Sequence, residues 1–144
     1  METMNHFTDL YNAEKYAKFY DAVISLGHFL PEQFRQDKKY LFLDFGDENF
    51  ASVNADPNNL KYAPKEQHVR QIIDFIRNLK PTDKLLVHCF AGYSRSPAAV
   101  AIARCERDGL TLNKALENLK HYRIPDGVVP WPNDIILHEY LMIK

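Results

Sequence analysis

The sequence predicts an α/β fold, in which a mostly parallel central sheet is flanked by helices. Two observations lead to this prediction. Short apolar segments alternate along the chain with segments whose apolar residues recur at helical spacing, as expected when parallel strands are joined by crossing helices. One apolar segment also leads straight into a glycine-containing loop and an alanine-rich helix, which places a ligand site at the carboxyl end of a strand.

The first half of the chain predicts a helix, two strands and a long loop. Residues 9–20 intersperse aromatic and aliphatic side chains with charged ones in a mostly helical pattern. An apolar strand follows at 22–26 and ends at Gly27, and a second strand is expected at 40–45. Residues 46–63 are rich in aspartate, asparagine and proline, so we expect a long loop there, of the kind that often forms a lid.

The next segment predicts one strand between two helices. Pro64 opens a helix whose apolar residues repeat at helical spacing until Lys80-Pro81 stops it. A short apolar strand at 84–87 then precedes the glycine-containing loop. Beyond the loop, Pro97 and the alanines after it are typical of a helix start, and Asp108-Gly109 ends that helix.

Two more helices are expected at the carboxyl-terminal end. Thr111 caps the first, which runs through Leu119. Residues 124–132 form a proline-rich loop, and the last helix runs from Asn133 towards Lys144. Strands and helices therefore alternate as a parallel α/β sheet requires.

The residues that indicate chemistry lie between the strand at 84–87 and the helix that follows. In order they are His88, Cys89, Phe90, Ala91, Gly92, Tyr93, Ser94, Arg95 and Ser96. Unpaired N–H groups at a helix N-terminus bind anions, and Arg95 adds a planar two-pronged donor. The same positive field favours the thiolate form of Cys89, which is a nucleophile. The segment therefore predicts a phosphate site with a built-in nucleophile.

The run His88-Cys89-x5-Arg95-Ser96 resembles the signature of the cysteine-dependent protein tyrosine phosphatases, and residues 91–96 are most similar to the small dual-specificity branch. The order of the segments 23–26, 41–47 and Pro132-Asn133 is similar as well, so the resemblance covers most of residues 20–144. It is closer to compact bacterial tyrosine-phosphatase-like proteins than to receptor-type domains. The length of 144 residues fits one domain, so together with the resemblance we expect a single phosphatase-like catalytic domain over residues 1–144.

The predicted reaction is hydrolysis of a phosphate ester through a phosphocysteine intermediate on Cys89. Arg95 and the amides of Phe90, Ala91, Gly92, Tyr93 and Ser94 would hold the phosphate oxygens. The resemblance implies that Ser96 donates a hydrogen bond to the departing thiolate and that Asn133 packs beside the loop. We expect His88 to orient the loop from behind.

A general acid must protonate the leaving oxygen, and Asp47 is the first candidate because it lies just past the strand at 40–45. Asp44 and Asp56 are the alternatives. The segment Trp131-Pro132-Asn133-Asp134 is similar to an acid loop of larger tyrosine phosphatases, but it follows the cysteine loop instead of preceding it. We interpret it as a cap of the final helix.

Phosphotyrosine in proteins, with phosphoserine or phosphothreonine as further options, is the favoured substrate because residues 90–94 carry no charge. Relatives that act on phosphoinositides often have lysines there. The alternatives are a small phosphate metabolite, a nucleotide or an inositol phosphate as substrate, or a catalytically weak phosphate-binding module. A rhodanese-like sulfur transferase is a third class that uses a cysteine loop.

Net charge, apolar runs and cysteine count limit the classes of partner that we expect. The 144 residues carry a net charge of −1, so no basic surface for nucleic acid is expected, and no apolar run is long enough to span a membrane. No signal peptide pattern is visible, and two cysteines, Cys89 and Cys105, fit a reducing compartment, so we expect a cytoplasmic protein. Cys105 is interpreted as core in preference to a resolving thiol. We expect a phosphorylated protein or peptide as partner and neither a metal nor another cofactor; no signal for an oligomeric state is present.

Overall fold

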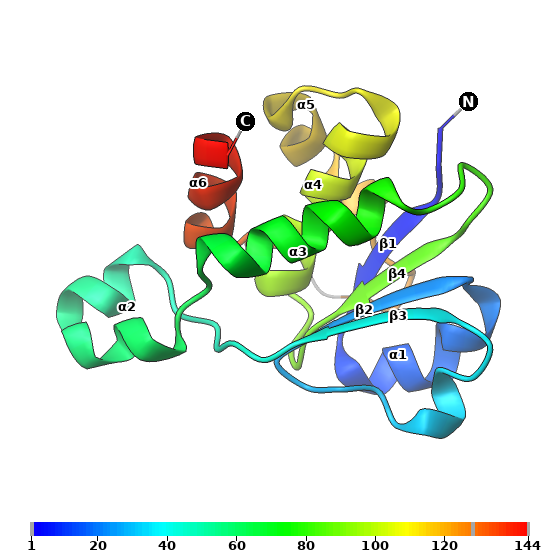
Figure 1. Cartoon of the computed structure of the whole chain (residues 1–144), viewed down its shortest axis with the longest axis horizontal. Helices are drawn as coiled ribbons and strands as arrows, with labels where there is room; N and C mark the ends of the chain where they lie inside the picture. The colour runs from blue at the N-terminus through cyan, green and yellow to red at the C-terminus, as the bar shows by residue number, and fades with distance from the viewer. Residues whose placement is uncertain (1, 128, 144) are drawn as a thin grey trace.

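The computed structural model of the protein describes residues 2–127 and 129–143 and contains a four-stranded, entirely parallel sheet (Figure 1). The strands are β1 (Asn5–Thr8), β2 (Ala22–Leu26), β3 (Lys39–Leu43) and β4 (Leu85–His88), in the spatial order β1-β4-β2-β3. The predicted α/β class is therefore confirmed. Because β4 pairs with β1 on one side and β2 on the other, Cys89 follows an interior strand.

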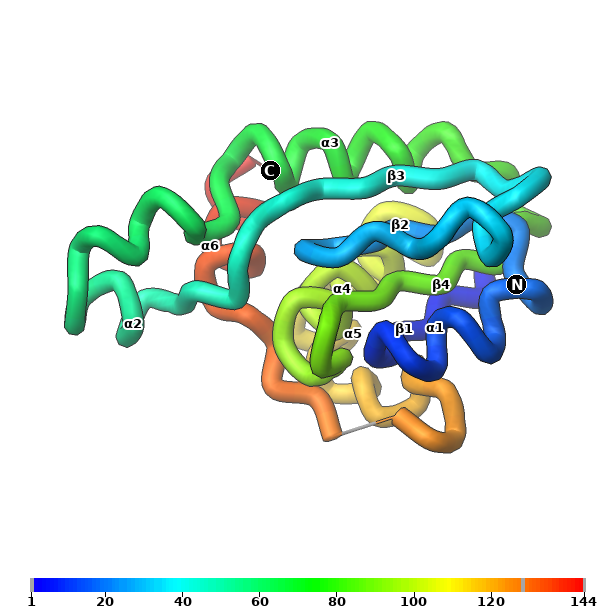
Figure 2. The backbone as a smooth tube through the Cα atoms, turned by 90° about the horizontal axis from the view of Figure 1, so that it is seen from below, coloured from blue at the N-terminus to red at the C-terminus, as the bar shows by residue number. Residues whose placement is uncertain are grey.

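Helices cover both faces of this sheet. One face packs against α1 (Leu10–Tyr16), and the other packs against α3 (Glu66–Arg77), α4 (Arg95–Asp108) and α6 (Asp134–Ile143) (Figures 1 and 2). Helix α5 (Leu112–Glu117) packs against α4, whereas α2 (Phe50–Ala55) lies beyond the end of the sheet (Figure 2). Among the described residues, no helix is both long enough and apolar enough to span a bilayer.

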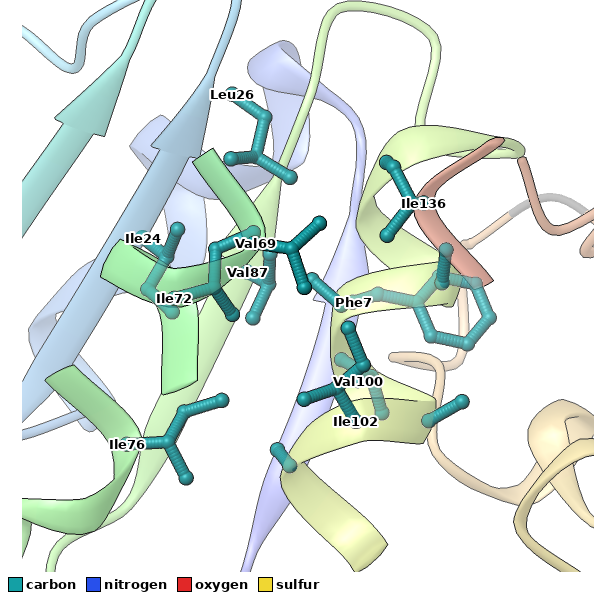
Figure 3. Packing of buried hydrophobic residues seen from close by; sticks show 14 of the residues in the cluster. Phe7, Ile24, Leu26, Val69, Ile72, Ile76, Val87, Val100, Ile102 and Ile136 are labelled. Atoms are coloured by element: carbon teal, nitrogen blue, oxygen red, sulfur yellow. The ribbon is translucent and has the colours of Figure 1, made fainter. Parts of the chain in front are cut away.

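The alternation of side chains along the strands produces two cores. Ile24 and Val87 point to the face covered by α3 and α4, while Val23 and Leu86 point to the face covered by α1. The larger core also contains Phe7, Leu26, Val69, Ile72, Ile76, Val100, Ile102 and Ile136 (Figure 3). Burial of this apolar surface fixes the position of β4 relative to α4, and so fixes the loop between them.

The amino-terminal strand β1 was not among the predicted elements. Its sequence is Asn-His-Phe-Thr, which has no apolar alternation, and yet Asn5 and Thr8 are buried. Arg107 on α4 donates a hydrogen bond to the Asn5 side chain over 2.6 Å, so a polar residue is tolerated at a buried position because a distant residue pairs with it. Helix α1 is also shorter than the predicted range 9–20, with a 3-10 turn at Ala17–Phe19 after it.

The prediction of an unstructured loop over residues 46–63 was wrong. That range contains α2 and a 3-10 helix at Pro57–Tyr62. Helix α2 has no buried residue, and a capping box between Asn49 and Ser52 holds its start, so capping replaces the apolar pattern that normally reveals a helix.

The other boundaries move by a few residues. The second predicted strand ends at Leu43 and not at residue 45, and the helix after the cysteine loop begins at Arg95 and not at Pro97. Two predicted positions, residue 128 of the proline-rich loop and Lys144 of the last helix, lie outside the described residues.

Candidate active site

The loop from Cys89 to Ser94 connects β4 to α4 and rests on the turn between β1 and α1. Gly92 has a φ of +78°, and a Cβ there would lie 2.5 Å from the backbone nitrogen of Asp9. Leu10 donates its N–H to the carbonyl of Phe90 over 3.1 Å. Only glycine fits at position 92, both for its backbone angle and for the close approach of the neighbouring chain.

The sulfur of Cys89 is buried under this loop and accepts a hydrogen bond from it. The N–H of Gly92 donates to the sulfur over 3.2 Å, and the Ser96 hydroxyl lies 3.3 Å from it. The positive end of α4 begins a few residues further on. The sulfur therefore lies next to one N–H donor and one hydroxyl, at the amino-terminal end of α4.

The guanidinium of Arg95 is held in a slot that Gly27 makes possible. Its Nη1 donates to the carbonyl of Phe45 over 2.8 Å, and a Cβ on Gly27 would lie only 2.0 Å from that nitrogen. Arg95 is 8% exposed, and its Nε is buried with no hydrogen-bond partner among the described residues. A buried, unpaired donor is costly, so a phosphate oxygen is its natural acceptor.

The carboxylate of Asp47 lies against the same loop. Its Oδ1 accepts from the Ser94 hydroxyl over 2.6 Å and from the Asn133 amide over 3.1 Å. The same amide group of Asn133 also donates to the carbonyl of Glu48 over 2.8 Å. The segment after β3 is thereby fastened on the loop, which brings the first candidate acid to Ser94.

The two alternative acids occupy other positions. Asp44 is exposed beside His68. Burial lowers the pKa of that histidine, and the negative charge of Asp44 opposes this effect. Asp56 caps the 3-10 helix that follows it and accepts from the N–H of Asn58 over 3.1 Å. Among the described residues, no recorded hydrogen bond joins either carboxylate to the cysteine loop.

Asn133 joins three parts of the molecule. Its Oδ1 accepts from the N–H of Ile136 and so caps α6, as the sequence suggested for this position. Its backbone N–H donates to the carbonyl of Ser94 over 3.0 Å, and Trp131 similarly donates to the carbonyl of Tyr93 over 2.5 Å. The segment before α6 therefore lies beside the cysteine loop, and Asp134 instead accepts from the N–H of Phe50.

Behind the loop, a chain of hydrogen bonds that the sequence did not reveal holds His88. The N–H of Leu30 donates to the Tyr40 hydroxyl, which donates to the Ser25 hydroxyl. Ser25 lies 2.5 Å from Nε2 of His88, and Nδ1 lies 3.4 Å from the Cys89 carbonyl. With Ser25 donating to Nε2, the proton of the neutral ring sits on Nδ1 and points at that carbonyl.

Acidification is expected to destabilise the fold through His88. Burial lowers its pKa from the ordinary 6.5 to about 4, so between these values the unfolded chain binds a proton that the folded chain does not. The contribution of His88 to the free energy of unfolding is therefore fully present above pH 6.5, the pKa in the unfolded chain. It is lost as the pH drops towards 4, and the loss is about 3 kcal/mol. Burial also lowers the pKa of His6 and His68, which adds in the same direction.

Urea unfolding at about pH 7 and about pH 4.5 measures this loss, and an NMR titration of the His88 ring assigns it. His121→Gln, at an exposed position, is the control and should keep the same dependence on pH. A His88 ring that titrates near 6.5 would contradict the explanation.

The remaining cysteine is part of the packing. Cys105 is 6% exposed within the larger core, and it forms no disulfide with Cys89. No group of three or more histidine, cysteine, aspartate or glutamate side chains suited to a metal ion occurs within residues 2–127 and 129–143.

Comparison with known proteins identifies the fold. No protein-family model and no curated protein sequence matches the chain. Among solved structures, human DUSP28 is similar with a TM-score of 0.70 and 16% identity, over 96% of this chain and 89% of that one.

Two further solved structures are similar. Tk-PTP in its active form has a TM-score of 0.61 and 19% identity, over 96% and 86% of the two chains. The human tyrosine phosphatase-like serine/threonine/tyrosine-interacting protein has a TM-score of 0.61 and 22% identity, over 86% and 76%. The chain therefore has the fold of the compact dual-specificity phosphatases, as the resemblance in its sequence implied.

Proposed function

We propose that the protein is a cysteine-dependent phosphatase that hydrolyses phosphotyrosine in proteins, with phosphoserine and phosphothreonine as further substrates. The observation that carries this proposal is the pairing of two groups around one loop. The Cys89 sulfur accepts from the loop amide of Gly92, and the buried Nε of Arg95 has no acceptor among the described residues. A thiolate and a free planar donor at a helix N-terminus are what phosphoryl transfer to sulfur needs.

In the first step, the Cys89 thiolate attacks phosphorus, so that a sulfur–phosphorus bond forms and the bond to the leaving oxygen breaks. Arg95 and the loop amides hold the equatorial oxygens during the transfer. Asp47 gives its proton to the leaving oxygen, which departs as a neutral phenol or alcohol. Its place against Ser94 supports this role.

In the second step, water attacks the phosphocysteine and the sulfur–phosphorus bond breaks. Asp47, now ionised, takes the proton of the attacking water. Ser96, whose hydroxyl lies 3.3 Å from the sulfur, donates a hydrogen bond to the departing thiolate. His88 and Asn133 act as positioning residues, one behind the loop and one between the acid and the loop.

The surface around the loop supports an aromatic phosphate ester as substrate. Phe90 is 59% exposed and Tyr93 is 44% exposed, although both belong to the loop itself. Rings at the rim of a site provide faces against which the ring of a phosphotyrosine packs. Residues 90–94 carry no charge, which favours this substrate over a highly charged inositol phosphate.

Phosphate release from a panel of substrates tests the proposal, with Cys89→Ser as the blank. The panel contains phosphotyrosine peptides, phosphoserine and phosphothreonine peptides, nucleotides and inositol phosphates. We expect release to be fastest from phosphotyrosine. Phosphate release from nucleotides or inositol phosphates alone would indicate a phosphatase of small metabolites. Binding of phosphopeptides without any phosphate release would favour a phosphate-binding module. Sulfur transfer to cyanide would instead indicate a sulfur transferase.

Arg95→Lys is expected to lower kcat/KM by ~10²- to 10³-fold although the charge is kept. An ammonium cannot donate to Phe45 and present a second, parallel donor to a phosphate oxygen at the same time. Steady-state kinetics measure the loss, and circular dichroism checks the fold. Arg70→Lys, on the exposed side of α3, is the control and should leave the rate unchanged. A full rate in Arg95→Lys would remove this residue from the mechanism.

A further inference from the structure

A groove lies between α1 and the cysteine loop, and apart from Phe90 and Ala91 its lining residues have no role in the proposed reaction. It has a volume of about 370 Å³. Its lining residues are Asp9, Leu10, Tyr11, Glu14, Phe90 and Ala91. Four come from the start of α1 and two come from the cysteine loop, so the groove opens directly beside the place where a phosphate would sit.

The two walls of the groove are held together by the backbone. Leu10 donates its N–H to the carbonyl of Phe90 over 3.1 Å, and the tight approach of Gly92 to Asp9 leaves no space for a side chain. A substrate chain bound with its phosphate over the loop would therefore pass a wall whose position is set by the same contacts. The groove therefore shares Phe90 and Ala91 with the loop of the proposed active site.

The chemistry of the groove combines aromatic faces with negative charge. Tyr11 is 76% exposed and Phe90 is 59% exposed, so both rings are available for contact. Asp9 already accepts from the N–H of Asn12 over 2.7 Å as the cap of α1. Glu14, one turn along α1 from Tyr11, has no ion pair among those recorded for the described residues, and no lysine or arginine lines the groove.

We propose that this groove binds a lysine or arginine side chain of the phosphorylated protein substrate, a few residues from the phosphotyrosine. The aliphatic stem of such a side chain packs on the rings of Tyr11 and Phe90, and its cationic head reaches the carboxylate of Glu14. A neutral or acidic side chain would leave these groups unpaired. The inference rests on the proposed function and adds the charge of the segment that the site prefers.

Matched peptides test it. A phosphotyrosine peptide carries a single lysine that is moved through the flanking positions, and each version is compared with glutamine at the same place. We expect one position at which lysine raises kcat/KM by ~2- to 5-fold, as for an exposed ion pair, with a smaller gain at high salt. Hydrolysis of p-nitrophenyl phosphate, which does not reach the groove, should stay the same in Glu14→Gln.

The variants decide the assignment. Glu14→Gln should abolish the preference for lysine, while Glu117→Gln should preserve it. Glu117 is a matched control because it lines a separate groove with Leu116 and Trp131. A preference for lysine that survives in Glu14→Gln, or no preference for lysine over glutamine at any position, would overturn the proposal.

The proposed function can fail separately. If wild type releases phosphate from p-nitrophenyl phosphate and from every peptide no faster than Cys89→Ser does, the enzyme assignment is wrong. The same lysine and glutamine peptides are then compared by their Kd for Cys89→Ser, with and without Glu14→Gln. A lysine preference in Kd that depends on Glu14 would support the groove, and its absence would overturn it.

Discussion

Cys89→Ser is expected to lower phosphate release by at least ~10⁴-fold and to leave the binding of phosphate esters intact. A serine hydroxyl fits the space of the thiol and can accept from Gly92, but it is not ionised beside Ser96 at neutral pH. The variant therefore keeps the loop amides and Arg95 that bind the phosphate, and it loses the nucleophile. Single-turnover kinetics measure the first effect, and calorimetry with a phosphotyrosine peptide measures the second.

Cys105→Ser is the matched control, because it makes the same change in a buried cysteine of α4. Introducing a hydroxyl into the core is expected to lower Tm while turnover persists. Turnover retained in Cys89→Ser, or turnover lost in both variants with the fold intact, would contradict the assignment of Cys89 as the nucleophile.

Asp47→Asn is expected to lower kcat on phosphotyrosine peptides by ~10²- to 10⁴-fold, the usual contribution of a general acid. The amide oxygen of the asparagine can still accept from Ser94 and Asn133, so the segment stays in place while its transferable proton is lost. The decline of the rate at high pH should disappear, because that decline reports ionisation of the acid. The loss should be smaller for p-nitrophenyl phosphate, whose leaving group departs as a stable anion.

Asp44→Asn and Asp56→Asn distinguish the other assignments. Among the described residues, no hydrogen bond joins either carboxylate to Ser94, which pairs with Asp47 instead, so both variants should keep the wild-type pH profile. If Asp56→Asn removes the decline at high pH and Asp47→Asn does not, the segment carrying Asp56 must reach the loop during the reaction, and the proposed acid is wrong.

The fold was predictable where local pattern and burial agree. Helix α3 has its apolar residues at helical spacing, and β2 and β4 are apolar apart from Ser25 and His88, as buried parallel strands should be. The cysteine loop was recognisable because its chemistry depends on residue types at fixed spacing. Fold class and loop position therefore followed from the sequence.

The remaining elements depend on contacts between distant residues. Asn5 in β1 is buried because Arg107 pairs with it, and nothing local to β1 indicates that partner. Helix α2 is held by caps and buries no side chain, so no apolar period marks it. The pairing of Asn49 with Ser52 was the only local sign, and turn-forming residues around it obscured that sign.

The residues that hold Arg95 and His88 in place also depend on contacts between distant parts of the chain. Strands β3 and β4 separate Gly27 from Arg95 in the sequence, yet the missing side chain of Gly27 makes the slot for the guanidinium. Tyr40 and Ser25 were read as strand residues, and only the parallel register between β2 and β4 brings Ser25 opposite His88. Residue types that carry reactions are visible in a sequence, whereas those that hold them in place are visible through register and packing.

The position of Asn133 determines when, during synthesis on the ribosome, the proposed active site can be assembled. A ribosome makes Cys89 and Arg95 before α6, and α4 can dock on the sheet soon after them. Asp47 is made earlier still, but the amide that fastens its segment to the loop belongs to Asn133, at the start of α6. The thiol of Cys89 is thus made before the residue that holds the proposed acid in place, and under the proposed function hydrolysis at the full rate requires α6 to have been made.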